Sequence, residues 1–278
     1  MQLFDAHLHL ITPGHPLIPN NGYLPQPYTL EDYLADVGAL SEHGVDVRGG
    51  AVVSGSFQGF DQGYLIEALA QLRERFGASA GAESGFVGVT QLPANVTNAQ
   101  ISELDSAGVR AVRFNLKRGG SAGVDDLESL AQRVYDVAGW HTELYVDGRD
   151  LPELEPVLRR LPRISIDHLG MHRNGLDALL RLVERGARVK ATGFGRVELN
   201  PAEVMAAILK VNPAALMVGT DLPSTRARRP FAATDLDLIA ETVVGDPVAS
   251  TAAGVLIPPG LAAVFWDNAA RWYLHPER

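Results

Sequence analysis

Two histidines and an aspartate alternate near the start of the chain, in the segment FDAHLHL at residues 4–10. Every second side chain of a strand shares a face, so we expect Asp5, His7 and His9 to point one way and their apolar neighbours the other. Imidazole and carboxylate groups held together can bind a metal ion or transfer protons. A surface strand with histidines on its solvent side would show the same pattern, so the trio has meaning only in context.

Two further polar groups stand where apolar runs end. His168 follows the run in ISIDHLG, and Asp221 follows the run in LMVGTDLP. Taken singly, His168 could cap the next helix and Asp221 could begin a turn. Together with His7 and His9 they place four polar groups at strand ends, where barrel enzymes carry their chemistry. Four of the other histidines are predicted to be structural or solvated: His15, His43, His141 and His275.

The elements that position these groups can be located from periodicity. Eight apolar runs are expected as strands, at residues 3–8, 50–54, 85–89, 111–114, 143–146, 164–167, 188–191 and 216–219. Segments with helical spacing lie between them, at residues 29–44, 61–77, 98–108, 124–139, 151–161, 175–186 and 201–211. Thr29 followed by Asp32 is typical of a helix start, and Gly44 of a helix end.

This alternation of strand and helix predicts the fold. No glycine-rich nucleotide loop follows the first strand, which favours an α/β protein of the (β/α)8 TIM-barrel type over a doubly wound open sheet. The open sheet would instead place a ligand crevice at a topological switch point. We expect a single domain over residues 1–278, with the apolar helical segment at 260–274 packed on the barrel.

Composition narrows the function. The 278 residues carry a net charge of −9 without a basic cluster, which argues against nucleic acid or an anionic membrane as partner. No apolar run is long enough to span a membrane, and the start has no export signal. The absence of cysteine removes disulfides and thiolate metal sites. We therefore expect a cytoplasmic protein acting on a small molecule, with its oligomeric state left open.

Five segments in order carry a family resemblance. They are DAHLHL, GVRAVRFN, the stretch WHTELYVDGRDLPELEPVLRRLPRISIDHLG, GTDLP and NAARWY. Together they resemble the amidohydrolase superfamily, and within it the branch of pyrone-dicarboxylate and sugar lactonases. The resemblance covers nearly the whole chain, and it implies a barrel hydrolase that opens a lactone ring.

The resemblance leaves the metal question divided, because some lactonases of this branch work without a metal. A zinc or manganese ion, if present, would take its ligands from His7, His9, His168 and Asp221. Relatives with a fuller metal complement carry a histidine after the fifth strand, where this chain has Tyr145. We expect no required cofactor, with one divalent metal as the alternative.

Without a metal, side chains must supply the chemistry of lactone hydrolysis. Asp221 is the predicted general base for water, and His7, His9 and His168 are predicted to polarise the carbonyl by hydrogen bonds or as imidazolium ions. Asp5 could either fix the tautomer of one imidazole or form a buried hydrogen bond across the barrel.

Arginines should select the substrate, because guanidinium groups bind carboxylates in a bidentate manner. The family resemblance maps substrate arginines onto Arg113, Arg118 and Arg196. It maps polar substrate contacts onto Tyr28, Ser56 and Tyr145.

Two departures from the family pattern qualify this mapping. Met171, His172 and Arg173 stand where the family has an arginine directly. The stretch LPSTRARRPF follows Asp221 where many relatives have a Trp-Pro pair, and it contains Arg226, Arg228 and Arg229. The sequence does not assign a role to His172, Arg173 or Arg226. A carboxylated or polyhydroxylated lactone remains the expected substrate class.

Three functions stay open. The first is a lactone hydrolase acting on an acidic or lactone substrate. The second is a metal-dependent decarboxylase of an aromatic or muconate-type acid, which predicts a stoichiometric metal and loss of activity on chelation. The third is a barrel that only binds an acidic metabolite, for which replacing Asp221 by asparagine would leave function intact.

Overall fold

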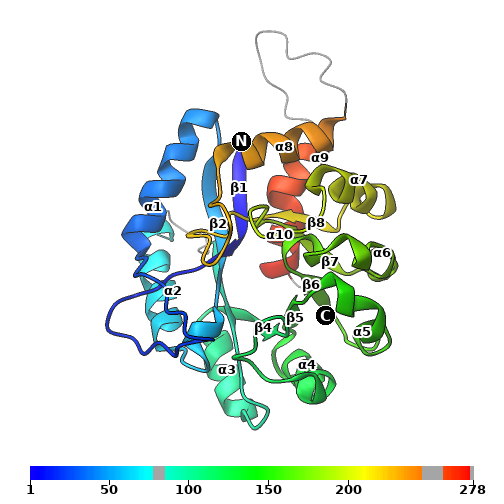
Figure 1. The fold of residues 1–278 in the computed structure, drawn as a ribbon. Helices are drawn as coiled ribbons and strands as arrows, with labels where there is room; N and C mark the ends of the chain where they lie inside the picture. Colours follow the sequence, from blue (N-terminus) through cyan, green and yellow to red (C-terminus); the bar gives the residue numbers. More distant parts are fainter. Residues whose placement is uncertain (78–84, 246–258, 276–278) are drawn as a thin grey trace.

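The computed structural model describes residues 1–77, 85–245 and 259–275. Eight parallel strands form one sheet in the order of the chain, so each strand pairs with the next (Figure 1). The strands are β1 Gln2–Leu8, β2 Asp46–Val53, β3 Gly85–Thr90, β4 Val109–Asn115, β5 His141–Tyr145, β6 Ile164–Ile166, β7 Arg188–Ala191 and β8 Leu216–Val218.

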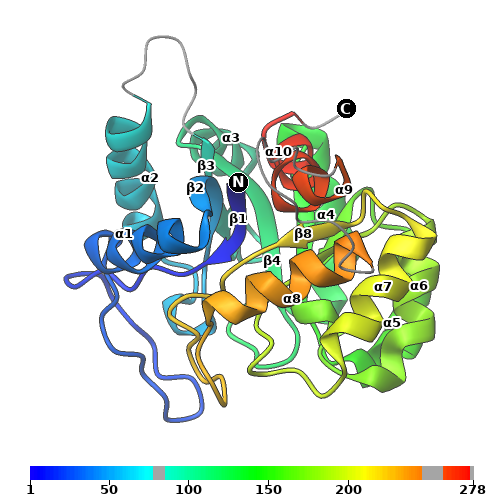
Figure 2. The same ribbon diagram turned by 90° about the horizontal axis from the view of Figure 1, so that it is seen from above.

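Helices surround the strands, as the two perpendicular views show (Figures 1 and 2). The helices are α1 Leu30–Ala39, α2 Gly63–Phe76, α3 Asn98–Ser106, α4 Val124–Ala138, α5 Leu151–Leu158, α6 Leu176–Glu184, α7 Pro201–Val211, α8 Ala233–Val244, α9 Pro259–Ala262 and α10 Asn268–Tyr273. A short π-helical segment, Ala263–Asp267, joins α9 to α10.

The sheet curls round so that its last strand meets its first. Beyond β8, the amide of Asp221 donates to the carbonyl of His7 at 2.7 Å, and the amide of His9 donates to the carbonyl of Leu222 at 2.9 Å. The sequential strand order has no reversal, which excludes the doubly wound sheet. The chain is a (β/α)8 TIM barrel, as the alternation of strands and helices predicts.

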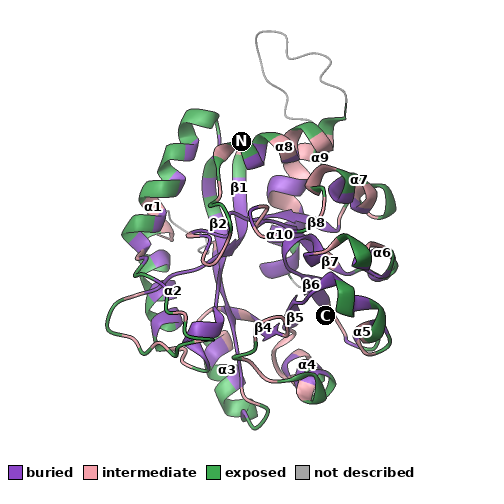
Figure 3. Ribbon diagram, viewed as in Figure 1, coloured by how far each residue is buried: buried purple, intermediate pink, exposed green. Residues whose placement is uncertain are grey.

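Burial follows the layers of a barrel. The strands are almost entirely buried, while the helices bury one side and expose the other (Figure 3). A large apolar cluster fills the layer between strands and helices. A smaller cluster, which includes Phe4, Ala51, Val89 and Met217, fills the interior of the barrel toward the end where the strands begin. The polar residues therefore gather at the opposite end, beyond the carboxyl ends of the strands.

Local signals account for the boundaries that the sequence predicts. The hydroxyl of Thr29 accepts from the amide of Asp32, and the Asp32 carboxylate accepts from the amide of Thr29, so α1 begins with a capping box. Gly44 has φ 71° and ends the short 3₁₀ turn that comes after α1. These signals are local, which is why the sequence alone locates them.

Two expectations need correction. The predicted helical segments do not include α8, although Leu236 and Ile239 have helical spacing and are buried. His141 does not precede its strand, as the sequence suggests, but is the first residue of β5, where it is buried beside Glu143. It lies at the end of the barrel opposite the site, so its structural role stands.

The C-terminal helix closes the barrel where the strands begin. The ring of Tyr273 stacks on that of Phe4, with ring centroids 5.4 Å apart. The side-chain amide of Asn268 donates from Nδ2 to the carbonyl of Leu216 at 2.9 Å. The predicted packing of this segment on the barrel is confirmed. No helix in the described part of the chain is long and apolar enough to cross a membrane.

Candidate active site

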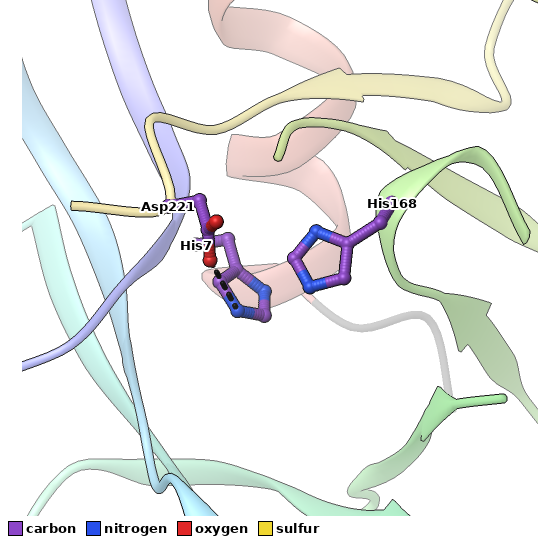
Figure 4. Close-up of side chains that lie close together, drawn as sticks. All are labelled: His7, His168 and Asp221. Atoms are coloured by element: carbon purple, nitrogen blue, oxygen red, sulfur yellow. Dashed lines mark ion pairs between the residues drawn. The ribbon is translucent and has the colours of Figure 1, made fainter. Parts of the chain in front are cut away.

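Three of the four predicted catalytic residues meet at the mouth of the barrel. His7 is the second-last residue of β1, His168 lies two residues after β6, and Asp221 lies three residues after β8 (Figure 4). One polar atom from each lies within 4.8 Å of the others. His7 Nε2 is 3.8 Å from Asp221 Oδ1, and the rings of His7 and His168 are 4.8 Å apart. All three side chains are buried.

His9 joins this cluster from the end of β1. Its Nδ1 lies 2.7 Å from the carbonyl of Val53, so Nδ1 carries a proton and donates there. Its Nε2 therefore faces the cluster, 3.7 Å from Asp221 Oδ1. The ring orientation is fixed by a backbone carbonyl, which is a rigid partner.

The first strand does not keep the strict alternation expected of it. Phe4 and Ala6 lie in the interior apolar cluster, whereas Leu8 and Leu10 lie in the layer under the helices. The pairing of β1 with β2 shifts register between Asp5 and Leu8. This irregularity lets His7 face inward although Ala6 also does, because a bulge changes the face of the residues after it.

Asp5 consequently does not reach an imidazole. Its carboxylate accepts from the amide and hydroxyl of Thr220, at 2.8 and 2.7 Å, and from the hydroxyl of Tyr33 at 3.0 Å. Burial raises the pKa of Asp5 to about 6, although these hydrogen bonds oppose the rise. Of the two roles weighed for Asp5, the buried hydrogen bond is the one found, and it ties β1 to the segment that presents Asp221.

Asp221 is already paired in this structure. Arg196 donates Nε–H to Asp221 Oδ2 at 2.9 Å, and its Nη2 bonds the same oxygen. Burial alone would raise the pKa of Asp221, but Arg196 and the neighbouring histidines hold it well below its usual range. Asp221 is therefore an aspartate at neutral pH. Arg196, predicted as a substrate contact, reaches the predicted base directly.

His7 and His168, which lie next to Asp221, are neutral. Burial is the main cause that lowers the pKa of His7, to about 3, with Asp167 opposing it and Lys190 assisting. Burial also lowers the pKa of His168 well below its usual value. Of the two predicted modes of carbonyl polarisation, these pKa values favour hydrogen bonding over imidazolium ions for His7 and His168.

Arg113 is held by a second buried carboxylate. Its Nη2 and Nε donate to Asp167 Oδ2 at 2.8 and 3.1 Å, and its Nη1 donates to the carbonyl of Ser54 at 2.9 Å. The guanidinium also lies 5.2 Å from the centre of the Tyr145 ring. Arg113 therefore faces the site but is largely committed to Asp167.

A narrow cavity of about 30 Å³ opens above the cluster. Five of the predicted substrate residues line it: Ser56, Arg113, Arg118, Tyr145 and Arg196. His9 and His168 line it as well. Tyr28 does not, because its hydroxyl donates to Asp36 of α1 at 2.7 Å, away from the mouth. The structure thus brings together all predicted substrate contacts except Tyr28.

A basic cavity of about 190 Å³ adjoins the first and shares Arg118, Arg196 and Arg226 with it. Arg226 also fastens the long loop after β1: its Nη1 donates to Asn20 Oδ1 at 3.0 Å, and its guanidinium lies 4.3 Å from the centre of the Tyr23 ring. A cavity of 30 Å³ holds about one water molecule, so a lactone ring requires these loops to move apart.

The residues that interrupt the family pattern lie outside the cluster. His172 lines the basic cavity, where its Nε2 is 3.7 Å from Glu198, and its Nδ1 accepts from the amide of Asn174. Arg173 is exposed. Arg228 donates to the carbonyl of Val197, and Arg229 pairs with Asp235.

Sequence reasoning missed three buried charges beneath the mouth. Glu143, Asp167 and Lys190 lie on or directly after β5, β6 and β7, and each is fully buried. The sequence gives a signal for two of them, because Lys190 and Glu143 are charged residues within the segments predicted as strands at 188–191 and 143–146. A charged residue inside a buried strand is expected only where it is paired.

The donor atoms of the cluster fit a divalent metal only in part. His7 Nε2, His168 Nδ1 and Asp221 Oδ1 have no hydrogen-bond partner among the described residues, and two nitrogens with one carboxylate oxygen suit zinc. The charges fit poorly, because each of the three buried carboxylates beside the cluster is already paired with a cation. The pairs are Arg196 with Asp221, Arg113 with Asp167, and Lys190 with Glu143. A dication added to this balanced set would leave two positive charges without counter-charge in a buried site.

Comparison with known proteins places this barrel in a family. A family model described as amidohydrolase matches residues 4–274. The chain therefore belongs to the amidohydrolase family.

Individual relatives add detail. A 2-pyrone-4,6-dicarboxylate hydrolase from Comamonas testosteroni is 30% identical over 171 residues, and the match spans 60% of this chain but only about half, 51%, of that protein. A structure from Pseudomonas putida, provisionally named a 2-pyrone-4,6-dicarboxylic acid hydrolase, is 25% identical with a TM-score of 0.75, covering 99% of this chain and 98% of that one. An apo structure from Agrobacterium tumefaciens is similar in fold, with a TM-score of 0.77 at 20% identity over 98% of this chain and 95% of that one.

Proposed function

We propose that this protein hydrolyses the lactone ring of a small carboxylated molecule, of the kind represented by 2-pyrone-4,6-dicarboxylate. The observation that carries the proposal is the meeting of one ionised aspartate with neutral imidazoles under a rim of arginines. The names of the Comamonas testosteroni and Pseudomonas putida relatives support the same class of substrate.

Asp221 serves as the general base in this mechanism. Its Oδ1 faces the imidazoles and has no hydrogen-bond partner among the described residues, so it is free to accept a proton from water. The water attacks the lactone carbonyl carbon, and the proton held on Asp221 then passes to the ring oxygen as the C–O bond breaks. One water is consumed, and a hydroxyl group and a carboxylic acid are formed, and the acid releases its proton to solvent at neutral pH.

The imidazoles stabilise the oxyanion that forms on the carbonyl oxygen. Because His7 and His168 stay neutral, each offers one N–H as a donor and brings no extra charge. The deep burial of both rings strengthens these hydrogen bonds, since little water competes for them. His9 presents Nε2 to the same space, held in place by the Val53 carbonyl.

Arg196 links substrate recognition to the base. In the resting site it holds Asp221, and this keeps the carboxylate weakly basic. A carboxylate on the substrate would compete for the same guanidinium, with Arg118 close by at the rim. Drawing Arg196 away from Asp221 raises the basicity of Asp221 when an acidic substrate is bound. Acidic lactones are therefore expected to react faster than neutral ones of the same ring.

A metal-dependent alternative is favoured by one observation, the three facing atoms that lack partners among the described residues. A divalent ion held by His7, His168 and Asp221 would polarise a carboxylate or carbonyl oxygen, as a decarboxylase of an aromatic or muconate-type acid requires. The paired charges described above support the mechanism without metal instead.

The test combines metal analysis with assay of a lactone panel by pH-stat. We expect hydrolysis of carboxylated lactones that survives chelation, and a loss of about 1,000-fold in kcat for Asp221→Asn. Asparagine tolerates the positive φ of 61° at this position, so the backbone should persist. Asp46→Asn, at an exposed site, is the control. Stoichiometric metal with no lactone turnover would support the decarboxylase, and full function of Asp221→Asn would support a binding protein.

A further inference from the structure

Lys190 stands at the centre of a cluster that resembles a metal site. Its ammonium nitrogen is 2.5 Å from Glu143 Oε2. It is also 3.3 Å from His7 Nδ1 and 3.3 Å from Asp167 Oδ1. One atom each of His7, Glu143 and Asp167 lies within 4.8 Å of the others, which is the arrangement of a three-ligand cation site. The cation at this place is the side chain of Lys190.

The hydrogen bond between Lys190 and His7 decides where the imidazole keeps its proton. An ammonium group only donates, so His7 Nδ1 must accept from it. Asp167 Oδ1 lies 3.3 Å from the same ring nitrogen, yet it has no hydrogen-bond partner among the described residues. The hydrogen-bond geometry therefore favours acceptance by His7 Nδ1 from Lys190 over donation to Asp167, and this would place the proton of the neutral ring on Nε2.

The tautomer of His7 determines what Nε2 can do in the site, because Nε2 faces the cluster. Nε2 faces Asp221 Oδ1 at 3.8 Å, next to the ring of His168. A protonated Nε2 is a hydrogen-bond donor toward a carbonyl oxygen but cannot ligate a metal. With the opposite tautomer, Nδ1–H would donate to Asp167 and Nε2 would offer a lone pair, which is the usual carboxylate–histidine–metal arrangement.

We propose that Lys190 is a positioning residue that replaces a metal ion: its ammonium fixes His7 with the proton on Nε2, so that this imidazole donates to the substrate and does not ligate a cation. The benefit to catalysis rests on the proposed function, whereas the tautomer does not. Lys190 never touches the substrate in this arrangement, because it lies below His7 and is fully buried.

Charge balance predicts the effect of removing Lys190. Lys190→Met leaves the carboxylates of Glu143 and Asp167 with one cation fewer, and it frees His7 Nδ1 to donate to Asp167. His7 Nε2, His168 and Asp221 then present lone pairs to one point. The variant should therefore gain a divalent metal site at the mouth, where the native chain has a hydrogen-bond donor.

The test measures tautomer and metal binding without any substrate. ¹⁵N-histidine NMR distinguishes the two neutral forms of His7, with His7→Gln used to assign its signals. We expect Nε2–H in the native protein and Nδ1–H in Lys190→Met, and we expect zinc to bind the variant at least 100-fold more tightly than the native protein. Lys210→Met, at an exposed site on α7, should behave as the native protein does.

The double variant Lys190→Met with Glu143→Gln removes one charge of each sign, and it carries the same test if the single variant does not fold. A native His7 with its proton on Nδ1, or a folded variant with an unchanged tautomer or no gain in zinc affinity, would overturn the inference. If the tautomer behaves as expected and the native protein opens no lactone, the proposed function fails and the inference about Lys190 stands. Where lactones are hydrolysed, kcat of the variant without zinc should fall about 100-fold with little change in KM.

Discussion

Arg196, in the segment after β7, and Asp221, in the segment after β8, form a buried ion pair. Arg196 Nε is 2.9 Å from Asp221 Oδ2. The pair joins a residue predicted to recognise the substrate to the residue predicted to act as base. A further hydrogen bond, from Arg196 Nη2 to the carbonyl of Thr225 at 3.0 Å, holds the guanidinium against the loop after β8. In the proposed mechanism, the charge of the substrate and the basicity of Asp221 are coupled through this contact.

Replacing Arg196 by lysine should expose that coupling. Lysine keeps the positive charge but cannot bind a carboxylate through two parallel N–H donors. We expect kcat/KM for a carboxylated lactone to fall about 10- to 100-fold, and the value for a neutral lactone to change much less, in steady-state assays. Arg228→Lys is the matched control, because the Arg228 guanidinium donates to the backbone carbonyl of Val197 and forms no ion pair with a carboxylate among the described residues. Equal losses on both kinds of lactone would contradict the coupling.

Gly193 should be required for the position of His168. It has φ +62°, and a Cβ added there would lie 2.5 Å from His168 Nδ1. Gly193→Ala must therefore displace the imidazole, and we expect kcat to fall at least 10-fold. Gly44→Ala offers a control with the same kind of backbone strain, φ +71°, and nothing within 4 Å of the new methyl group. Similar kcat losses in the two variants would show that strain alone is responsible.

Asp5 should make stability fall as pH rises through about 6. Its pKa in the fold is raised to about 6 from 3.8, so folding favours the protonated form, and this contribution is lost on ionisation. Asp5→Asn stays neutral, and its amide can satisfy Thr220 and Tyr33. The free energy of unfolding of Asp5→Asn, taken relative to that of the native protein, should therefore rise by about 1 kcal/mol from pH 5 to pH 7.5, as measured by urea titration. Asp46→Asn, on the surface, should show no such trend.

Arg226 should hold the loop over the mouth. Arg226→Ala removes the bond to Asn20 and the contact with Tyr23, so amide hydrogens in residues 18–24 should exchange faster. The expected increase is about 10-fold, by mass spectrometry. Arg229→Ala, which breaks a pair with Asp235 outside this loop, should leave exchange there unchanged. Unaltered exchange in Arg226→Ala would mean that other contacts hold the loop.

The barrel can be predicted from the sequence because its strands and helices are signalled locally. Capping at Thr29 and the end at Gly44 depend on neighbouring residues only, and both are found as expected. The meeting of residues at the mouth also derives from strand ends, since parallel strands bring their carboxyl ends together. This rule alone predicts that His168 and Asp221 lie near the end of the strand that carries His7.

The register of the strands and the choice of ion-pair partners across the barrel, by contrast, cannot be predicted from the sequence. The inward turn of His7 depends on a register shift that no residue type signals, and the commitment of Arg113 to Asp167 depends on distances across the barrel. In the sequence, Lys190 is only an interruption of a short strand. The role proposed for Lys190 rests on its contacts with Glu143 and His7 across the barrel.

Tyr273 sits near the end of the chain, yet its hydroxyl bonds Glu143, the carboxylate that holds Lys190. All eight strands precede it in the order of synthesis. We expect the eight strands of a newly synthesised chain to pair first. The buried hydrogen bonds around Glu143 would be completed only when α10 packs against the barrel. The buried side chains of Glu143 and Lys190 beneath the mouth would then be among the last to reach their final positions.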